Sequence, residues 1–324
     1  MELTADPERM TAHIPSLTGR TIVVTGANSG LGYEATRIFA EKDASVVMAC
    51  RDTDRGREAA ERISRTIPGA ALEVLELDLA DLDSVRAFVA RFEADYEDLH
   101  VLCNNAGVMA IPRRETADGF ETQFGVNHLG HFALTGLLCE TLARTDDETR
   151  VITQSSAAHE NGEIDFEDLQ GERSYSKWGA YGQSKLANVL FAYELDRRLS
   201  AAGLDVKSVA CHPGYAATEL QTTGPAMEGS LLKQWAMAGA NRLVAQSAAM
   251  GALPMLYAGT ASTIEGGEYI GPDSPFGARG YPTRAESSAR SHDRVAAERL
   301  WEVSTELTGV EFDLDRAEAG PTAR

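Results

Sequence analysis

Lysine is scarce in this chain: it supplies five of the 30 basic residues, whereas aspartate and glutamate together number 49. The formal net charge is −19 at pH 7, and a field of that sign repels nucleic acids and anionic membrane surfaces. Neither is therefore expected as a partner. Few lysines beside many acids are typical of proteins kept soluble at very high salt, as in halophiles; an ordinary acidic protein is the alternative.

Cysteine is also scarce, and no metal-binding pattern is present. The four cysteines show no C-x-x-C or other metal-ligand spacing, which indicates buried free thiols in a reducing compartment. His128 and His131 lie three positions apart without further ligands around them in sequence. Two helix histidines are therefore favoured over a metal site, and no metal is expected. The cysteines are Cys50, Cys103, Cys139 and Cys211.

Targeting segments and long apolar runs are missing as well. Residues 1–18 contain acids and prolines but no cationic stretch followed by an apolar core, so no secretory signal is predicted. The uncharged stretch 243–264 contains Gln246, Ser247 and Pro254, which argue against a membrane span. We expect a soluble, cytoplasmic protein, in which a homo-oligomer is possible.

Short apolar runs alternate with amphipathic stretches through most of the chain. Near-continuous apolar strands joined by helices are typical of a parallel sheet buried on both faces, so we predict a doubly wound α/β fold. No linker or repeat divides it: we expect one domain at 19–309, a substrate lid at about 218–258, and tails at 1–18 and 310–324. The seven predicted strands are 21–25, 45–49, 72–77, 99–103, 150–154, 205–210 and 268–270.

A glycine-rich turn follows the first predicted strand. Gly26, Gly30 and Gly32 allow the backbone to approach a pyrophosphate, and the helix expected over 33–42 offers its amino end to the phosphates. The spacing is Gly-x-x-x-Gly-x-Gly, in a strand–turn–helix context. It predicts a dinucleotide site, with a purely structural turn as the alternative.

The residue that ends the second strand bears on the choice of dinucleotide. An acid there accepts hydrogen bonds from the ribose of NAD, whereas an arginine meets the 2′-phosphate of NADP. Arg51 stands at that end and favours NADP(H); NAD(H) is possible. Asp52 comes one position later, where capping the next helix is its simpler role.

Tyr181 and Lys185 lie four residues apart, at the start of what reads as an amphipathic helix. Residues i and i+4 share a helix face, so the Lys185 ammonium can stand near the Tyr181 phenol. A phenol titrates near pH ~10, and a positive charge about 4 Å away can lower its pKa by several units. The spacing predicts a tyrosine tuned for proton transfer; an exposed pair arising by chance is the alternative.

These segments together resemble the short-chain dehydrogenase/reductase family over roughly 19–309, which implies a single-domain Rossmann fold with a mostly parallel seven-stranded sheet. The resemblance implies a catalytic set of Asn127, Ser156, Tyr181 and Lys185. The cofactor residues that it implies, besides Arg51, Tyr181 and Lys185, are Gly26, Asn28, Ser29, Gly30, Leu31, Gly32, Asp78, Leu79, Asn105, Ala106, Gly107, Pro213, Gly214 and Thr218.

Within that family the chain is most similar to the retinol-dehydrogenase-like and WW-domain-oxidoreductase-like branch. The segments that carry this likeness are 49–51, 164–169, 180–188 and 266–272, together with Leu300 and Trp301. No membrane-anchoring helix precedes the glycine motif and no WW module is attached, so neither membrane residence nor partner binding is carried over.

The resemblance implies hydride transfer between NADP(H) and an alcohol or its carbonyl product, with Tyr181 as acid or base, Ser156 on the substrate oxygen and Asn127 supporting a proton relay. The stretch 218–258 is rich in Leu, Met and Ala, includes Trp235 and is poor in charge, which predicts an apolar substrate. Two alternatives stand beside this: an NADP-sensing binding protein on the same fold, and a sugar-nucleotide epimerase or dehydratase of the extended branch.

Overall fold

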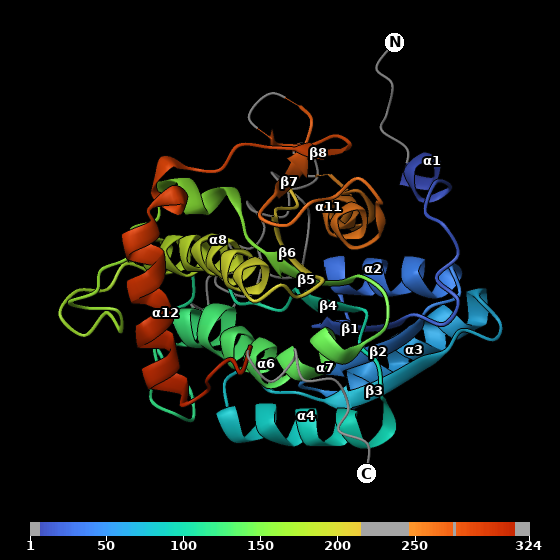
Figure 1. Ribbon diagram of the computed structural model, residues 1–324, viewed down its shortest axis with the longest axis horizontal. Coiled ribbons are helices and arrows are strands. Elements are labelled where there is room, and N and C mark those ends of the chain that lie inside the picture. The colour runs from blue at the N-terminus through green and yellow to red at the C-terminus, as the bar shows by residue number, and fades with distance from the viewer. Residues whose placement is uncertain (1–6, 215–245, 275–276, 315–324) are drawn as a thin grey trace, which may run out of the picture.

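A mostly parallel sheet of eight strands forms the centre of this computed structural model, which describes residues 7–214, 246–274 and 277–314 (Figure 1). The strand order is β3-β2-β1-β4-β5-β6-β7-β8, and the order reverses between β1 and β4, where sheets of this type bind ligands beyond the strand ends. The strands are β1 (Thr21–Thr25), β2 (Ser45–Cys50), β3 (Leu72–Glu76), β4 (Val101–Asn104), β5 (Thr149–Gln154), β6 (Val206–Cys211), β7 (Tyr269–Pro272) and β8 (Pro282–Arg284).

Helices cover both faces of the sheet, as the alternation of apolar and amphipathic segments predicts (Figure 1). One face carries α2 (Gly30–Glu41), α3 (Thr53–Thr66) and α11 (Ala248–Thr260). The other carries α4 (Leu82–Asp95), α6 (Gly130–Leu137) and α8 (Lys177–Ala201), with α12 (Arg294–Thr308) packed against α8. Shorter elements are α1 (Pro7–Thr11), α5 (Thr122–Phe124), α7 (Cys139–Arg144), a π-helical turn (Gly125–Leu129) and two 3₁₀ turns (Ala157–Asn161 and Ala289–His292).

Two apolar cores lie between these helices and the sheet. Alternation along β1 sends Ile22 and Val24 into the core under α2 and α11, and Val23 into the core under α4, α6 and α8. Burial on both faces accounts for the near-continuous apolar character of the central strands. The four cysteines are all buried and free, as predicted.

The sheet has eight strands where seven were predicted. All seven predicted runs form strands, with ends shifted by at most two residues. The eighth, β8, pairs antiparallel with β7 at the edge of the sheet. It has three residues, starts at Pro282 and leaves Thr283 and Arg284 exposed. The segment is therefore too short to be predicted as a strand, and its sequence shows no apolar alternation.

Helix α8 is not the amphipathic helix that its sequence suggests. Every residue from Tyr181 to Leu195 is buried, because α8 packs on β5 and β6 on one side and on α12 and the 3₁₀ turn after β5 on others. A helix buried all round needs no polar face. Within the described ranges, no helix is long and apolar enough to cross a membrane.

The expected tails and lid also differ from the structure where it describes them. Leu17 is buried in the α2/α11 core, and at the other end Val310 is buried while the Phe312 ring lies 4.5 Å from that of Trp301. Residues 248–258 of the expected lid form most of α11, which is core rather than lid because its apolar residues pack against α2. The lid prediction for residues 218–245 lies outside the described residues.

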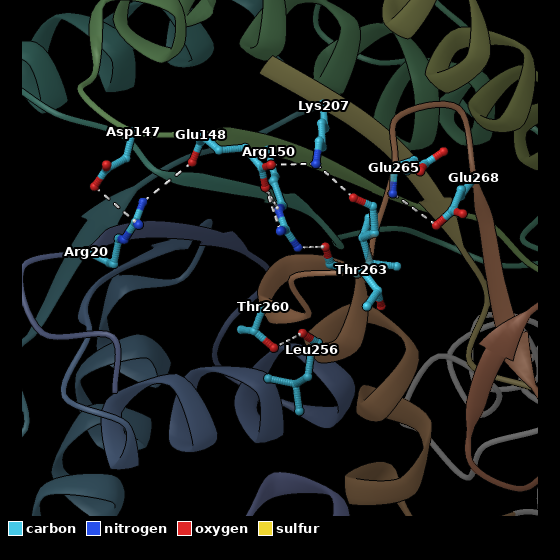
Figure 2. Close-up of polar contacts among 12 residues, drawn as sticks. Arg20, Asp147, Glu148, Arg150, Lys207, Leu256, Thr260, Thr263, Glu265 and Glu268 are labelled. Carbon is cyan, nitrogen blue, oxygen red and sulfur yellow. Dashed lines mark hydrogen bonds and ion pairs between the residues drawn. The ribbon is translucent and has the colours of Figure 1, made fainter. Parts of the chain in front are cut away.

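A network of charged side chains lies at the amino end of β5, next to α11 (Figure 2). Arg150 is 7% exposed; its Nη1 donates to Ala258 O at 2.8 Å, and its Nη2 lies 2.6 Å from Glu148. Lys207 on β6 binds the other Glu148 oxygen at 2.5 Å and donates to Ile264 O. Both cations lower the pKa of Glu148 against the effect of its burial. One carboxylate therefore pairs with two cations at the junction of β5, β6 and α11.

Replacing Glu148 by glutamine should destabilise the protein by about 2–4 kcal/mol, because it leaves the nearly buried Arg150 guanidinium without a counter-charge. Urea unfolding followed by circular dichroism measures the change. The neighbouring Asp147 pairs with Arg20 at 3.3 Å, with side chains 70% and 35% exposed. Asp147→Asn is the matched control and should cost less than about 1 kcal/mol. Equal losses in the two variants would show that the network adds nothing beyond a surface ion pair.

Candidate functional site

The loop after β1 turns tightly against the amino end of α2. Gly26 and Gly30 have φ angles of +66° and +55°, and a Cβ on Gly32 would lie 2.4 Å from the Gly26 carbonyl oxygen. Glycine is therefore required at this close approach. The helix begins at Gly30, three residues earlier than predicted, which brings the last two glycines of the motif into its first turn.

The first turn of α2 is suited to an anion. Ser29 occupies the N-cap position without making a side-chain capping bond, and the first-turn amides of a helix have no intrahelical acceptor. Those N–H groups and the positive helix end form a cradle for a pyrophosphate. Asn28 and Leu31 lie in the same turn. A dinucleotide therefore fits the residues present.

Thr25, the last residue of β1, joins the ends of β1 and β4. Its Oγ1 accepts the backbone N–H groups of Asn105 and Ala106, both at 2.9 Å, and Asn105 Nδ2 donates to Thr25 O at 2.8 Å. The hydroxyl also lies 2.9 Å from His131 Nε2, and His131 Nδ1 lies 3.1 Å from the main-chain oxygen of Asn127. Since that oxygen can only accept, Nδ1 carries the hydrogen and Nε2 accepts from Thr25. The glycine turn is thus tied to the Asn127 helix.

Asn127 lies in the π-helical turn and clamps the segment after β4. Its Oδ1 accepts from Val108 N at 2.8 Å, and its Nδ2 donates to Val108 O and to Ser184 Oγ, both at 2.9 Å. A Cβ on Gly107 would lie 2.9 Å from Asn127 Oδ1 and 3.6 Å from Lys185 Nζ. The Asn127 side chain therefore borders the Lys185 ammonium at Gly107. Single π-helical turns are frequent at functional sites.

The ends of β2 and β3 carry the residues predicted to hold the adenosine half of the cofactor. Arg51 is exposed and makes no hydrogen bond or ion pair with the described part of the chain. Asp52 caps α3 by accepting from Arg55 N at 3.0 Å, as predicted. Beyond β3, Asp78 Oδ1 accepts from Ala80 N at 3.0 Å, and Leu79 is buried.

Two serines follow β5, and they have different surroundings. Ser155 is buried and its Oγ donates to Lys185 O at 2.8 Å, which fixes α8 to the end of β5. Ser156 is half-buried; its Oγ accepts from Ala158 N at 3.2 Å and lies close enough to Tyr181 to hydrogen-bond the phenol. Of the two serines, Ser156 is the one whose hydroxyl lies beside that phenol.

Tyr181 and Lys185 lie together near the start of α8. Lys185 Nζ stands 5.8 Å from the centre of the Tyr181 ring and donates to Gln154 O, the last residue of β5, at 3.1 Å. Both side chains are buried, at 6% and 4% exposure. The Trp178 indole meets the Tyr181 ring edge-to-face at 6.1 Å. The four-residue spacing therefore brings the pair together at the end of the sheet.

The pKa values of the pair differ from the simple expectation. Burial raises the pKa of Tyr181 to about 12, although the hydrogen bond with Ser156 acts in the opposite direction. Burial also lowers the pKa of Lys185 to about 8. Desolvation disfavours the charged form of each group, and the Lys185 ammonium is turned toward a carbonyl of β5. The spacing thus places the pair together without producing the low phenol pKa that it predicts.

The turn after β6 completes this edge of the sheet. Pro213 O accepts from Gln246 Nε2 at 2.6 Å, and Gly214 N donates to His212 Nδ1 at 3.3 Å. Thr218, predicted to bind the cofactor here, lies outside the described residues. The remaining predicted residues follow the carboxyl ends of β1 to β6 or lie on α8 and the π-helical turn, so the parallel sheet brings them to one edge.

A surface cavity of about 420 Å³ lies elsewhere, at the outer edge of β7 and β8. Its walls include Tyr193, Glu268, Arg284 and His292, none of which belongs to the predicted site. Within the described residues, no group of three or more histidine, cysteine or acidic side chains is placed to hold a metal ion. His131 and His128 instead make hydrogen bonds, the latter to Ser304 Oγ at 2.9 Å.

Comparison with known proteins identifies the family. Residues 20–229 match the family described as short chain dehydrogenase. The chain belongs to the short-chain dehydrogenases. Members of this family use NAD(P)(H), and this dehydrogenase acts on CH–OH groups with that cofactor. The family predicted from the glycine turn and the tyrosine–lysine pair is confirmed.

Individual relatives place the dehydrogenase more narrowly. It is 41% identical to mouse (Mus musculus) retinol dehydrogenase 12 over 300 residues, which cover 91% of this chain and 88% of the relative. It is 39% identical to a polyprenol dehydrogenase of Danio rerio, covering 92% and 89%. A crystal structure of an uncharacterized protein from Mycobacterium paratuberculosis is 42% identical with a TM-score of 0.75, covering 93% of this chain and 98% of that chain. The retinol-dehydrogenase-like resemblance is confirmed.

Proposed function

We propose that this dehydrogenase interconverts an apolar alcohol and its aldehyde or ketone with NADP(H), and that Tyr181 gives or takes the proton. The observation that carries the proposal is the convergence of Tyr181, Ser156 and Lys185 at the end of β5, within the strand edge that holds the glycine turn. A sensor that only binds the dinucleotide has no need of these three groups.

When bound, NADPH would supply a hydride to the carbonyl carbon. The chain's own residues handle the oxygen: Ser156 hydrogen-bonds it and Tyr181 donates the phenol proton to it, so that an alcohol is formed. In oxidation Tyr181 takes the alcohol proton instead. A neutral phenol, which burial favours here, is the form that reduction requires. Lys185 and Asn127 would stabilise Tyr181 and help to deliver protons to its phenol from the buried side.

The proposal for NADP over NAD rests on the end of β2. Asp52 is already engaged as the helix cap, whereas Arg51 is exposed and unpaired within the described chain. A free guanidinium suits the 2′-phosphate of NADP, and a charge-assisted contact contributes about 1.5–3 kcal/mol.

Arg51→Ala should therefore weaken NADPH binding about 10- to 100-fold and leave NADH binding nearly unchanged. Fluorescence titration of both cofactors measures the ratio. The control is Arg57→Ala, which removes an exposed arginine of α3 that pairs with Asp54 at 2.7 Å and should leave both affinities unchanged. An equal loss for both cofactors in Arg51→Ala would remove the basis for an NADP preference.

The proposal of an apolar substrate is supported by the Trp178 side chain. Trp178 lies one helical turn before Tyr181, contacts its ring and is 52% exposed. An exposed indole beside the reacting phenol offers an apolar wall to a substrate chain. The relatives named for retinol and polyprenol act on alcohols of that character.

Trp178→Ala should lower kcat/KM for decanal about 10-fold and for butanal much less, since a longer apolar chain buries more surface on the indole. Initial rates of NADPH oxidation measure both. Val295→Ala is the control, because Val295 on α12 is the other large apolar side chain that is exposed among the described residues, at 75%. A clear preference of the wild type for charged sugars would contradict the proposal of an apolar substrate.

A further inference from the structure

His159 lies in the 3₁₀ turn directly after Ser156 and is 1% exposed. Both of its ring nitrogens have partners. Nδ1 is 2.7 Å from Ser156 O, and Nε2 is 3.0 Å from Ser288 N. The imidazole thus spans from the carbonyl of the reacting serine to the chain segment between β8 and α12.

The partners fix which nitrogen carries the hydrogen. The Ser288 N–H is a donor only, so Nε2 must accept, and the ring is a neutral imidazole with its hydrogen on Nδ1. Nδ1 then donates to Ser156 O. Burial lowers the pKa of His159, in agreement with a neutral ring. The backbone N–H of His159 donates to the same oxygen at 3.0 Å. One residue therefore supplies two donors to the Ser156 carbonyl.

Aromatic side chains also pack around the His159 ring. The Tyr269 ring on β7 meets His159 edge-to-face at 5.2 Å, with its hydroxyl 3.3 Å from Nδ1, and His212 stacks on Tyr269 at 5.2 Å. The peptide plane that follows Ser156 is thus held by a buried side chain, which restrains the Ser156 backbone and so the direction of its Cα–Cβ bond.

We propose that His159 is a positioning residue for the reaction: through its Nδ1–H it fixes the Ser156 carbonyl and so aims the Ser156 hydroxyl at the Tyr181 phenol and the substrate oxygen. This inference rests on the proposed function, because it assigns His159 a role through Ser156. If His159 were merely structural, loss of the hydrogen bond at either ring nitrogen would lower the stability alike. A positioning residue instead affects kcat, and it does so through the nitrogen that faces Ser156.

Two conservative variants separate these roles. Asparagine places an amide N–H near the position of Nδ1 and keeps the donor to Ser156, while glutamine reaches the position of Nε2 and keeps only the acceptor for Ser288. We expect kcat of His159→Asn to stay within about 3-fold of wild type and that of His159→Gln to fall about 10- to 100-fold, since small misplacements of a reacting group cost that much. KM for NADPH should not change in either variant.

The experiment measures kcat and KM with NADPH and decanal, per NADPH-binding site counted by titration, together with thermal melting of the same samples. Because turnover is expressed per NADPH-binding site, poorly folded material lowers the number of sites and does not lower kcat. His100→Gln is the matched control: His100 is buried at the far end of β4 and its Nδ1 accepts from Thr21 N at 3.0 Å. It should lower the melting temperature and leave kcat unchanged.

Equal kcat values for His159→Asn and His159→Gln, or a loss of kcat that follows the melting temperature across all three histidine variants, would overturn the inference. Ser156→Ala distinguishes that outcome from failure of the proposed function. If Ser156→Ala abolishes turnover while the His159 variants behave alike, the function stands and the positioning role falls. If Ser156→Ala retains full turnover, the proposed function itself is wrong.

Discussion

Replacing Tyr181 by phenylalanine should lower kcat about 10³-fold or more while NADPH binding is retained. The change removes only the hydroxyl, and general acid–base groups contribute about 10²–10⁴-fold. The phenylalanine ring keeps the buried position and the edge-to-face contact with Trp178. Steady-state reduction of an apolar aldehyde and fluorescence titration of NADPH, measured on the same sample, test both halves of the statement.

Tyr193→Phe is the matched control for that experiment. Tyr193 lies on the same helix, is nearly buried, and places its hydroxyl 2.8 Å from Ser287 Oγ, away from the site. It should leave kcat unchanged. Comparable turnover in Tyr181→Phe and wild type would contradict the assigned role. Tight NADPH binding with no turnover of any alcohol or carbonyl, even by the wild type, would favour the sensor alternative.

Replacing Lys185 by methionine should lower kcat/KM about 10²-fold or more without unfolding the protein. Methionine matches the length of the lysine stem, and burial already disfavours the ammonium, whose pKa falls to about 8. Removing a desolvated charge therefore costs little stability. What is lost is the positive charge beside Tyr181 and Gly107. Kinetics and urea unfolding of the same variant separate the two effects.

Lys207→Met is the control for Lys185→Met and should show the opposite result, a loss of stability without a loss of activity. Lys207 binds Glu148 and the Ile264 carbonyl at the opposite end of the sheet. Its loss should lower the free energy of unfolding by about 1–2 kcal/mol and leave kcat/KM unchanged. An active Lys185→Met enzyme would remove Lys185 from the mechanism.

The fold was predictable from sequence because a parallel sheet buried on both faces concentrates its apolar residues in the strands. The seven predicted strands were found for that reason. The eighth was missed because β8 is short, exposed and starts with Pro282. The continuous burial of α8 was missed because it depends in part on α12, which begins 93 residues after α8 ends and packs against it.

The site was predictable where its signal is local in sequence. The glycine turn, Arg51 and the Tyr181–Lys185 spacing are such signals, and the parallel strands bring them to one edge. Thr25, His131 and His159 gave no signal of this kind, because each hydrogen-bonds a partner that lies 80 or more positions away in sequence. Burial also reversed the expected pKa shift of Tyr181, and desolvation cannot be read from a four-residue spacing.

The pH dependence of kcat/KM for alcohol oxidation tests the central claim, that Tyr181 transfers the proton and Lys185 tunes it. Tyr181 must lose its proton to act as base, so the rate should rise with pH as the phenol ionises, while Lys185, whose pKa burial lowers to about 8, gives the wild type a second ionisation. In Lys185→Met the ionisation of the phenol should move to higher pH, because a phenolate is less stable without the neighbouring positive charge. A rate independent of pH, or the same apparent pKa in wild type and Lys185→Met, would contradict the account.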